Sequence, residues 1–146
     1  MASDSYIALV ERFPEHLSDA KSLGSDVKIS GVDKIVFTGV GGSAIAGSLL
    51  QIYCSEKTQT VQFFVSRNYD VPSFVDKSTL VVAISYSGNT EETLSAVKAA
   101  MKRSARIVIV TSGGKLMQQA EQLKKPVVAL PEGIQPRAAL PYLFIP

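Results

Sequence analysis

Five short runs of apolar and β-branched residues alternate along the chain with segments of helical periodicity. Most runs are almost continuously apolar, such as LVVAI at 80–84 and IVIV at 107–110. This pattern is typical of strands that helices cover on both faces, as in parallel sheets. Repeated strand–helix units therefore predict an α/β fold in which helices sandwich a five-stranded parallel sheet. The expected strands are Lys34–Val40, Val61–Ser66, Thr79–Ser85, Arg106–Thr111 and Val127–Leu130.

Helical periodicity fills the segments around these runs. The expected helices are Tyr6–Leu23 with an interruption near Pro14, Ser43–Cys54, Asn89–Lys102 and Lys115–Leu123. A last helix is expected from Gln135, kinked at Pro141. We expect the terminal Leu143, Phe144 and Ile145 either to dock on the domain or to meet a partner, because chain termini are normally solvated.

Composition narrows the class of protein. The 146 residues suit one domain of ordinary size. With 46% hydrophobic and 19% charged residues, the chain is not disordered. One cysteine, Cys54, and one histidine, His16, are too few for a zinc cluster, and no metal is expected. A net charge of +2 without a dense basic patch argues against a nucleic-acid partner.

Targeting signals are not evident in the sequence. The first residues lack the basic and apolar regions of a signal peptide. Residues 35–55 carry no charge, but the GVGGS turn inside them predicts a strand, a loop and a helix rather than a membrane span. We therefore expect a cytoplasmic protein without a membrane partner, in keeping with its single cysteine.

The segments that follow the strands are the candidate site, because open parallel sheets bind ligands beyond the carboxyl ends of their strands. Four of these segments combine glycine with hydroxyl or charged groups, and they should converge on one edge. They are GVGGS at 39–43, SYSGNTEE at 85–92, TSGGK at 111–115 and PEGIQPR at 131–137.

The segment after the third strand carries the clearest signal. Ser85, Ser87 and Thr90 supply hydroxyl donors, Gly88 allows close approach of the backbone, and Asn89 can cap the next helix. Together with the positive end of a helix dipole, such groups suit a phosphate. The alternative is that these side chains only cap the helix.

The segment after the first strand has two interpretations. GVGGSA at 39–44 fits the loose dinucleotide fingerprint, although the second strand ends in VSRN at 65–68 without the acid that holds a ribose. Arg67 could suit a 2′-phosphate, so NADP binding stays open. The other interpretation is a tight strand-to-helix turn.

Other chemically active residues have ordinary structural explanations as well. Arg137 follows a proline at an expected helix start and could bind an oxygen-rich ligand or lie on the surface. Glu91 and Glu92 could act as bases, but acids in a first helical turn commonly complement the dipole. His16 lies away from the strand ends, and Cys54 is expected to behave as a small apolar residue.

Together the loops resemble the sugar isomerase (SIS) domain. The chain looks most like the N-terminal half of the bifunctional phosphoglucose/phosphomannose isomerases. The stretches that carry this resemblance are GVGGSAIAG at 39–47, RNYDVP at 67–72, TLVVAISYSGNTEETLSA at 79–96, IVIVTSGGKL at 107–116 and PEGIQPRAAL at 131–140.

The resemblance implies a flavodoxin-like three-layer fold, no cofactor and a sugar-phosphate ligand. It places the phosphate on Ser85, Ser87 and Thr90 with the backbone near Asn89. It places the sugar near Gly42 and Ser43, and it makes Arg137 the catalytic residue that stabilises an enediolate. The implied reaction interconverts glucose 6-phosphate or mannose 6-phosphate with fructose 6-phosphate through a cis-enediol.

Members of this family are about twice as long and carry their general base and ring-opening histidine in a second SIS domain. The resemblance therefore implies that residues 1–146 are a single SIS domain, the N-terminal half of a two-domain protein. We expect a homo-oligomer or a missing second half as partner. Whether this chain is an enzyme by itself stays open, and a non-catalytic sugar-phosphate sensor is the alternative.

Overall fold

The computed structural model describes residues 6–135 and 138–146. Five parallel strands form one sheet in the order β2-β1-β3-β4-β5, which confirms the predicted parallel α/β fold. The strands end within two residues of the expected positions. They are β1 (Lys34–Thr38), β2 (Gln62–Ser66), β3 (Thr79–Ile84), β4 (Arg106–Thr111) and β5 (Val127–Ala129).

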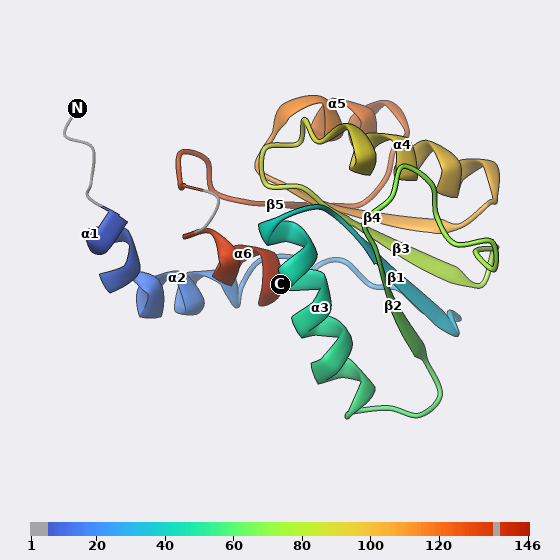
Figure 1. The fold of residues 1–146 in the computed structure, drawn as a ribbon, viewed down its shortest axis with the longest axis horizontal. Coiled ribbons are helices and arrows are strands. Elements are labelled where there is room, and N and C mark those ends of the chain that lie inside the picture. The colour runs from blue at the N-terminus through green and yellow to red at the C-terminus, as the bar shows by residue number, and fades with distance from the viewer. Residues whose placement is uncertain (1–5, 136–137) are drawn as a thin grey trace.

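Helices cover both faces of the sheet. One face packs against α4 (Glu91–Lys102) and α5 (Gly114–Gln122), and the other against α3 (Gly42–Ser55) with α6 (Leu140–Phe144) beside it (Figure 1). Right-handed crossovers explain this division. The chain moves from β1 outward to β2, but from β3 it moves the opposite way to β4 and β5. The strand order therefore reverses between β1 and β3, which makes this the topological switch point.

Alternate residues of the strands build two separate cores. On the α4–α5 side, Val36, Val81 and Ile109 are completely buried. On the α3–α6 side, Phe37 and Ile84 are buried together with parts of β4 and β5. Burial on both faces is the reason that the strands read as nearly continuous apolar runs.

Proline positions confirm one expectation about the helices and correct another: the N-terminal helix is interrupted near Pro14 as expected, but Pro141 does not kink the last helix. The N-terminal segment forms two helices, α1 (Tyr6–Glu11) and α2 (Phe13–Ala20), with Pro14 in the first turn of α2. The last helix begins at Leu140 rather than Gln135, and Pro141 sits in its first turn. A first-turn proline costs no helical hydrogen bond, so Pro141 starts this helix instead of kinking it.

The C-terminal residues dock on the domain. Leu143 is buried in the core on the α3–α6 side, and Phe144 and Ile145 pack against the same core while remaining partly exposed. Of the two expectations for these side chains, the structure supports docking. None of the helices in the described ranges is both long and apolar enough to cross a membrane.

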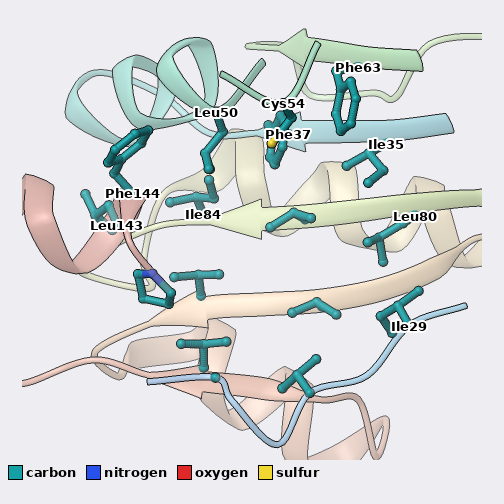
Figure 2. Close-up of a pocket in the computed structure, with 17 residues that line it drawn as sticks. Ile29, Ile35, Phe37, Leu50, Cys54, Phe63, Leu80, Ile84, Leu143 and Phe144 are labelled. Atoms are coloured by element: carbon teal, nitrogen blue, oxygen red, sulfur yellow. The ribbon is translucent and has the colours of Figure 1, made fainter. Parts of the chain in front are cut away.

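An apolar cavity of about 260 Å³ lies between the sheet, α3 and the C-terminal helix. Figure 2 shows Leu50 and Cys54 of α3 facing the sheet, with Leu143 and Phe144 at one end. Its lining is almost entirely hydrocarbon, so it offers few donors to a charged ligand. Burial raises the pKa of the Cys54 thiol, which agrees with the expected role as a small apolar residue.

Replacement of Ile109 by alanine tests the central position of β4. Because Ile109 is fully buried between β3 and β5, we expect Ile109→Ala to lower the free energy of unfolding by about 2–5 kcal/mol. Urea denaturation measures this loss. Met101→Ala on the exposed side of α4 is the control and should cost less than about 1 kcal/mol. Equal losses in the two variants would contradict the assignment of the core.

Candidate functional site

The predicted loops meet at the switch point between β1 and β3. A small cavity of about 130 Å³ opens there, and we call it the switch-point cavity. None of the described residues that line it carries a charge. They are Val40, Gly42, Ser43, Ser85, Tyr86, Ser87, Thr90 and Leu143. Five of the residues selected from the sequence are therefore brought together, and Arg137 lies outside the described residues.

Two helix N-termini reach the switch-point cavity. Gly42 and Ser43 form the first turn of α3, and Thr90 is the N-cap of α4. Neither N-cap makes a side-chain hydrogen bond to its own helix. The first backbone N–H groups of a helix lack intrahelical partners, and the helix dipole adds positive potential there. The cavity thus has the electrostatics of an anion site without any basic side chain.

A short chain of hydrogen bonds runs through the loop between β3 and α4, which borders the switch-point cavity. The N–H of Gly88 donates to the Ser85 hydroxyl at 3.2 Å, and that hydroxyl lies 2.9 Å from the Thr90 hydroxyl. When Ser85 donates to Thr90, the Thr90 proton is left for a ligand. Ser85 is almost fully buried although it lines the cavity, and its hydroxyl is already bonded to Gly88 and Thr90.

Asn89 does not cap the helix that follows it, contrary to our expectation. Its side-chain oxygen accepts a hydrogen bond from the N–H of Lys115 at 3.1 Å, in the first turn of α5. Its own N–H donates to the Ser87 hydroxyl at 3.3 Å, which leaves the Ser87 proton free to donate. The asparagine side chain therefore joins two loops, while Ser87 faces the cavity.

Two glycines allow the loops to approach closely. Gly88 has φ +65°, and a Cβ at this position would lie 1.8 Å from the carbonyl oxygen of Gly113. A Cβ on Gly39 would lie 2.7 Å from the carbonyl oxygen of Ile84. Any side chain would therefore separate the β3–α4 loop from its neighbours, which explains why glycine occupies both positions.

Tyr86 is the residue that sequence analysis missed. Its hydroxyl donates to the carbonyl of Pro131 at 2.7 Å and accepts from the N–H of Ile134 at 2.9 Å. Its own carbonyl accepts a hydrogen bond from the Ser112 hydroxyl at 2.6 Å. Tyr86 thus joins the loops after β3, β4 and β5. Burial is the main cause that raises the pKa of its phenol.

The remaining candidate acids and bases lie outside the switch-point cavity. His16 is buried in α2 with its ring 5.3 Å from that of Tyr142, and it is not among the residues that line the cavity. Glu132 lies at the same sheet edge, because a Cβ on Gly113 would be 3.6 Å from its carboxylate. Arg67 donates to the Ser48 hydroxyl of α3 at 3.3 Å.

A pair of glycine variants tests the packing of the loops. In Gly88→Ala, the alanine must adopt a left-handed backbone, which lowers the free energy of unfolding by about 1–2 kcal/mol. The clash of its Cβ with Gly113 lowers it by about 1–3 kcal/mol more. Gly133→Ala also has a positive φ, +79°, but its Cβ would meet nothing within 4 Å. Urea denaturation should therefore show the larger loss of stability for Gly88→Ala. Equal losses would mean that the loops do not touch at Gly88.

Two curated proteins are similar in sequence to most of this chain. A bifunctional phosphoglucose/phosphomannose isomerase from Caldicellulosiruptor bescii is 47% identical over 141 residues, covering 94% of this chain and 41% of that protein. A D-glucosamine-6-phosphate 4-epimerase from Sulfolobus acidocaldarius is 40% identical over 136 residues, covering 92% of this chain and 42% of that protein. The chain thus spans less than half the length of these curated relatives.

A solved structure supports the fold. The C-terminal domain of glucosamine-fructose-6-phosphate aminotransferase from Francisella tularensis matches with a TM-score of 0.68 at 18% identity, covering 99% of this chain and 48% of that chain. The SIS domain model matches residues 28–133, from just before β1 to the turn that Tyr86 holds after β5. Because this match spans most of the chain and includes every strand of the sheet, the chain belongs to the SIS domain family.

Proposed function

We propose that this chain binds the phosphate group of a hexose 6-phosphate in the switch-point cavity. The observation that carries the proposal is the meeting of two helix N-termini with the hydroxyls of Ser43, Ser87 and Thr90 in one uncharged cavity. Neutral donors and helix dipoles bind a phosphate reversibly, as a metabolite site requires. We infer a cytoplasmic location from the same ligand class.

In this proposal each hydroxyl in the cavity has its own hydrogen-bonding role. Thr90 donates to the phosphate because Ser85, held by the N–H of Gly88, can direct its own proton to Thr90. The Ser87 hydroxyl accepts a hydrogen bond from the N–H of Asn89 and donates its own proton to the phosphate. Ser43, in the first turn of α3, donates from a second element that lines the cavity. A phosphate oxygen would meet a donor on each side.

The size of the cavity limits what it holds. A volume of about 130 Å³ is well below the range of roughly 300–1,000 Å³ for whole small-molecule sites. The phosphate therefore fits inside, and the sugar extends outward past Gly42 and Ser43. We propose that Arg137 and the backbone near Asn89 contact the ligand at this outer part.

The proposed reaction is the isomerisation of glucose 6-phosphate or mannose 6-phosphate to fructose 6-phosphate in the complete protein. A base removes the C2 proton of the open-chain aldose, a cis-enediol forms, and a proton is returned to C1. We propose that Arg137 stabilises the negative charge on the enediolate oxygens. The curated isomerase relative at 47% identity supports this reaction.

Two features make binding without efficient turnover the second candidate for the chain alone. The described lining of the switch-point cavity contains no carboxylate and no imidazole, and His16 is buried outside that lining. The epimerase relative also shows that a different reaction occurs in a similar chain. A hexose phosphate is common to both candidates, so the ligand class does not depend on the reaction.

Removal of single hydroxyls tests phosphate binding. Ser87→Ala and Thr90→Ala should each weaken fructose 6-phosphate binding at least about tenfold, because a hydrogen bond to a charged group contributes about 1.5–3 kcal/mol. Isothermal titration calorimetry measures the effect. Ser55→Ala, at the far end of α3, is the matched control and should bind like the parent. If both site variants also bind like the parent, the hydroxyls do not hold the phosphate.

Catalysis by the chain alone is a separate prediction. General acid and base groups each contribute about 10²–10⁴-fold, so a chain whose cavity lacks both should convert glucose 6-phosphate very slowly while still binding it. A coupled isomerase assay measures the rate. Rapid turnover that Glu132→Gln abolishes would show that this chain supplies its own base, and the proposed division of roles would then be wrong.

A further inference from the structure

A polar cleft lies between α4 and the loop that follows β2, and Figure 1 shows this loop passing beside α4. The volume of the cleft, about 440 Å³, is within the usual range for small-molecule sites, roughly 300–1,000 Å³. None of the described residues that line it also lines the switch-point cavity. Lys98, Lys102 and Arg103 bring positive charge to this lining, and Asp70 brings negative charge. We call it the α4 cleft.

One ion pair in the α4 cleft has a structural role. Arg103, which follows α4, donates to the carbonyl of Pro72 at 2.8 Å, and its guanidinium lies 3.5 Å from the Asp70 carboxylate. That carboxylate also accepts a hydrogen bond from the N–H of Val71 at 2.8 Å. These contacts fix the loop against the end of α4. They also compensate the charges of Arg103 and Asp70, so the excess positive charge of the cleft rests on its lysines.

Lys98 and Lys102 are neighbours on the surface of α4, because they are four residues apart in the helix. Like charges at this spacing repel each other. Both side chains are exposed, and neither forms an ion pair with a carboxylate of the described residues. The helix dipole accounts for Lys102, which is in the last turn, but not for Lys98 in the turn before it. The pair is therefore available to a ligand with two neighbouring negative charges.

The loop contributes an exposed aromatic ring to the same cleft. Tyr69 lines the cleft and is 55% exposed, although a tyrosine ring is largely apolar. Along α4 the cleft is bordered by Ser95 and Ala99, whose small side chains leave room for a flat group. Aromatic side chains next to basic ones bind nucleotides, because the ring stacks on the base while the cations hold the phosphates.

We propose that the α4 cleft binds a nucleoside diphosphate such as ADP, with the base stacked on Tyr69 and the two phosphates held by Lys98 and Lys102. A single phosphate would use only part of the lysine pair, and an inorganic diphosphate would leave the ring unused. Because the α4 cleft and the switch-point cavity share no described lining residue, ADP and a hexose phosphate should not compete.

Isothermal titration calorimetry with ADP tests the role of the lysines. The double variant Lys98→Gln/Lys102→Gln should bind ADP at least about tenfold more weakly than the parent, because it loses two hydrogen bonds to charged groups. Lys28→Gln/Lys124→Gln removes the same charge at two exposed lysines outside the cleft and should bind like the parent. Equal losses in the two double variants, or a parent that does not bind ADP, would overturn the proposal.

A tyrosine variant separates a nucleotide site from a simple anion site. Tyr69→Ala should weaken ADP binding about fivefold or more, because stacking on the base is lost, and should leave the binding of inorganic diphosphate unchanged. Tyr53→Ala is the matched control, since Tyr53 is 54% exposed on α3, and it should bind both ligands like the parent. Unchanged ADP binding by Tyr69→Ala, or displacement of ADP by fructose 6-phosphate, would contradict a nucleotide site in the α4 cleft.

Discussion

The close contact between the loops after β3 and β4 is the constraint on which the site depends. Gly88 lies so near the carbonyl of Gly113 that no Cβ fits between them. The same approach lets Gly88 accept a hydrogen bond from the N–H of Leu116 at 2.8 Å. It also lets Asn89 reach α5. The start of α4, and with it Thr90, is thereby fixed against the neighbouring loop.

Tyr86 extends this arrangement to the third loop. Its carbonyl holds Ser112, and its hydroxyl is bonded on both sides to the turn between Pro131 and Ile134. The phenol therefore determines where the chain leaves the sheet edge on its way to Arg137. One side chain thus joins the loop that carries the proposed ligand-binding hydroxyls to the loop that precedes the proposed catalytic residue.

Most of the fold could be predicted from the sequence because burial on both faces leaves a clear mark on each strand. The apolar runs located all five strands, and the glycine and hydroxyl residues after them located the cavity. The role of Tyr86 could not be predicted, because its partners lie 45 and 48 residues away. The partner of Asn89, the N–H of Lys115, lies 26 residues away and depends on how two loops pack.

The apolar cavity beneath α3 and the switch-point cavity differ in chemistry. The larger one, beneath α3, is lined by hydrocarbon and has no counterpart to the donors of the switch-point cavity. Burial of Cys54 there raises the pKa of its thiol, consistent with a site that excludes charge. The position of the helix N-termini, rather than size, is what favours the switch-point cavity as the proposed phosphate site.

Backbone amide chemical shifts during titration with fructose 6-phosphate test the central claim most directly. The account predicts the largest shifts at Ser43, Ser87, Thr90 and the first turn of α4, and little change at Leu50 beneath α3. Unphosphorylated fructose should cause almost none of these shifts. Equal responses to the two sugars, or the largest shifts around the apolar cavity, would contradict phosphate binding at the switch point.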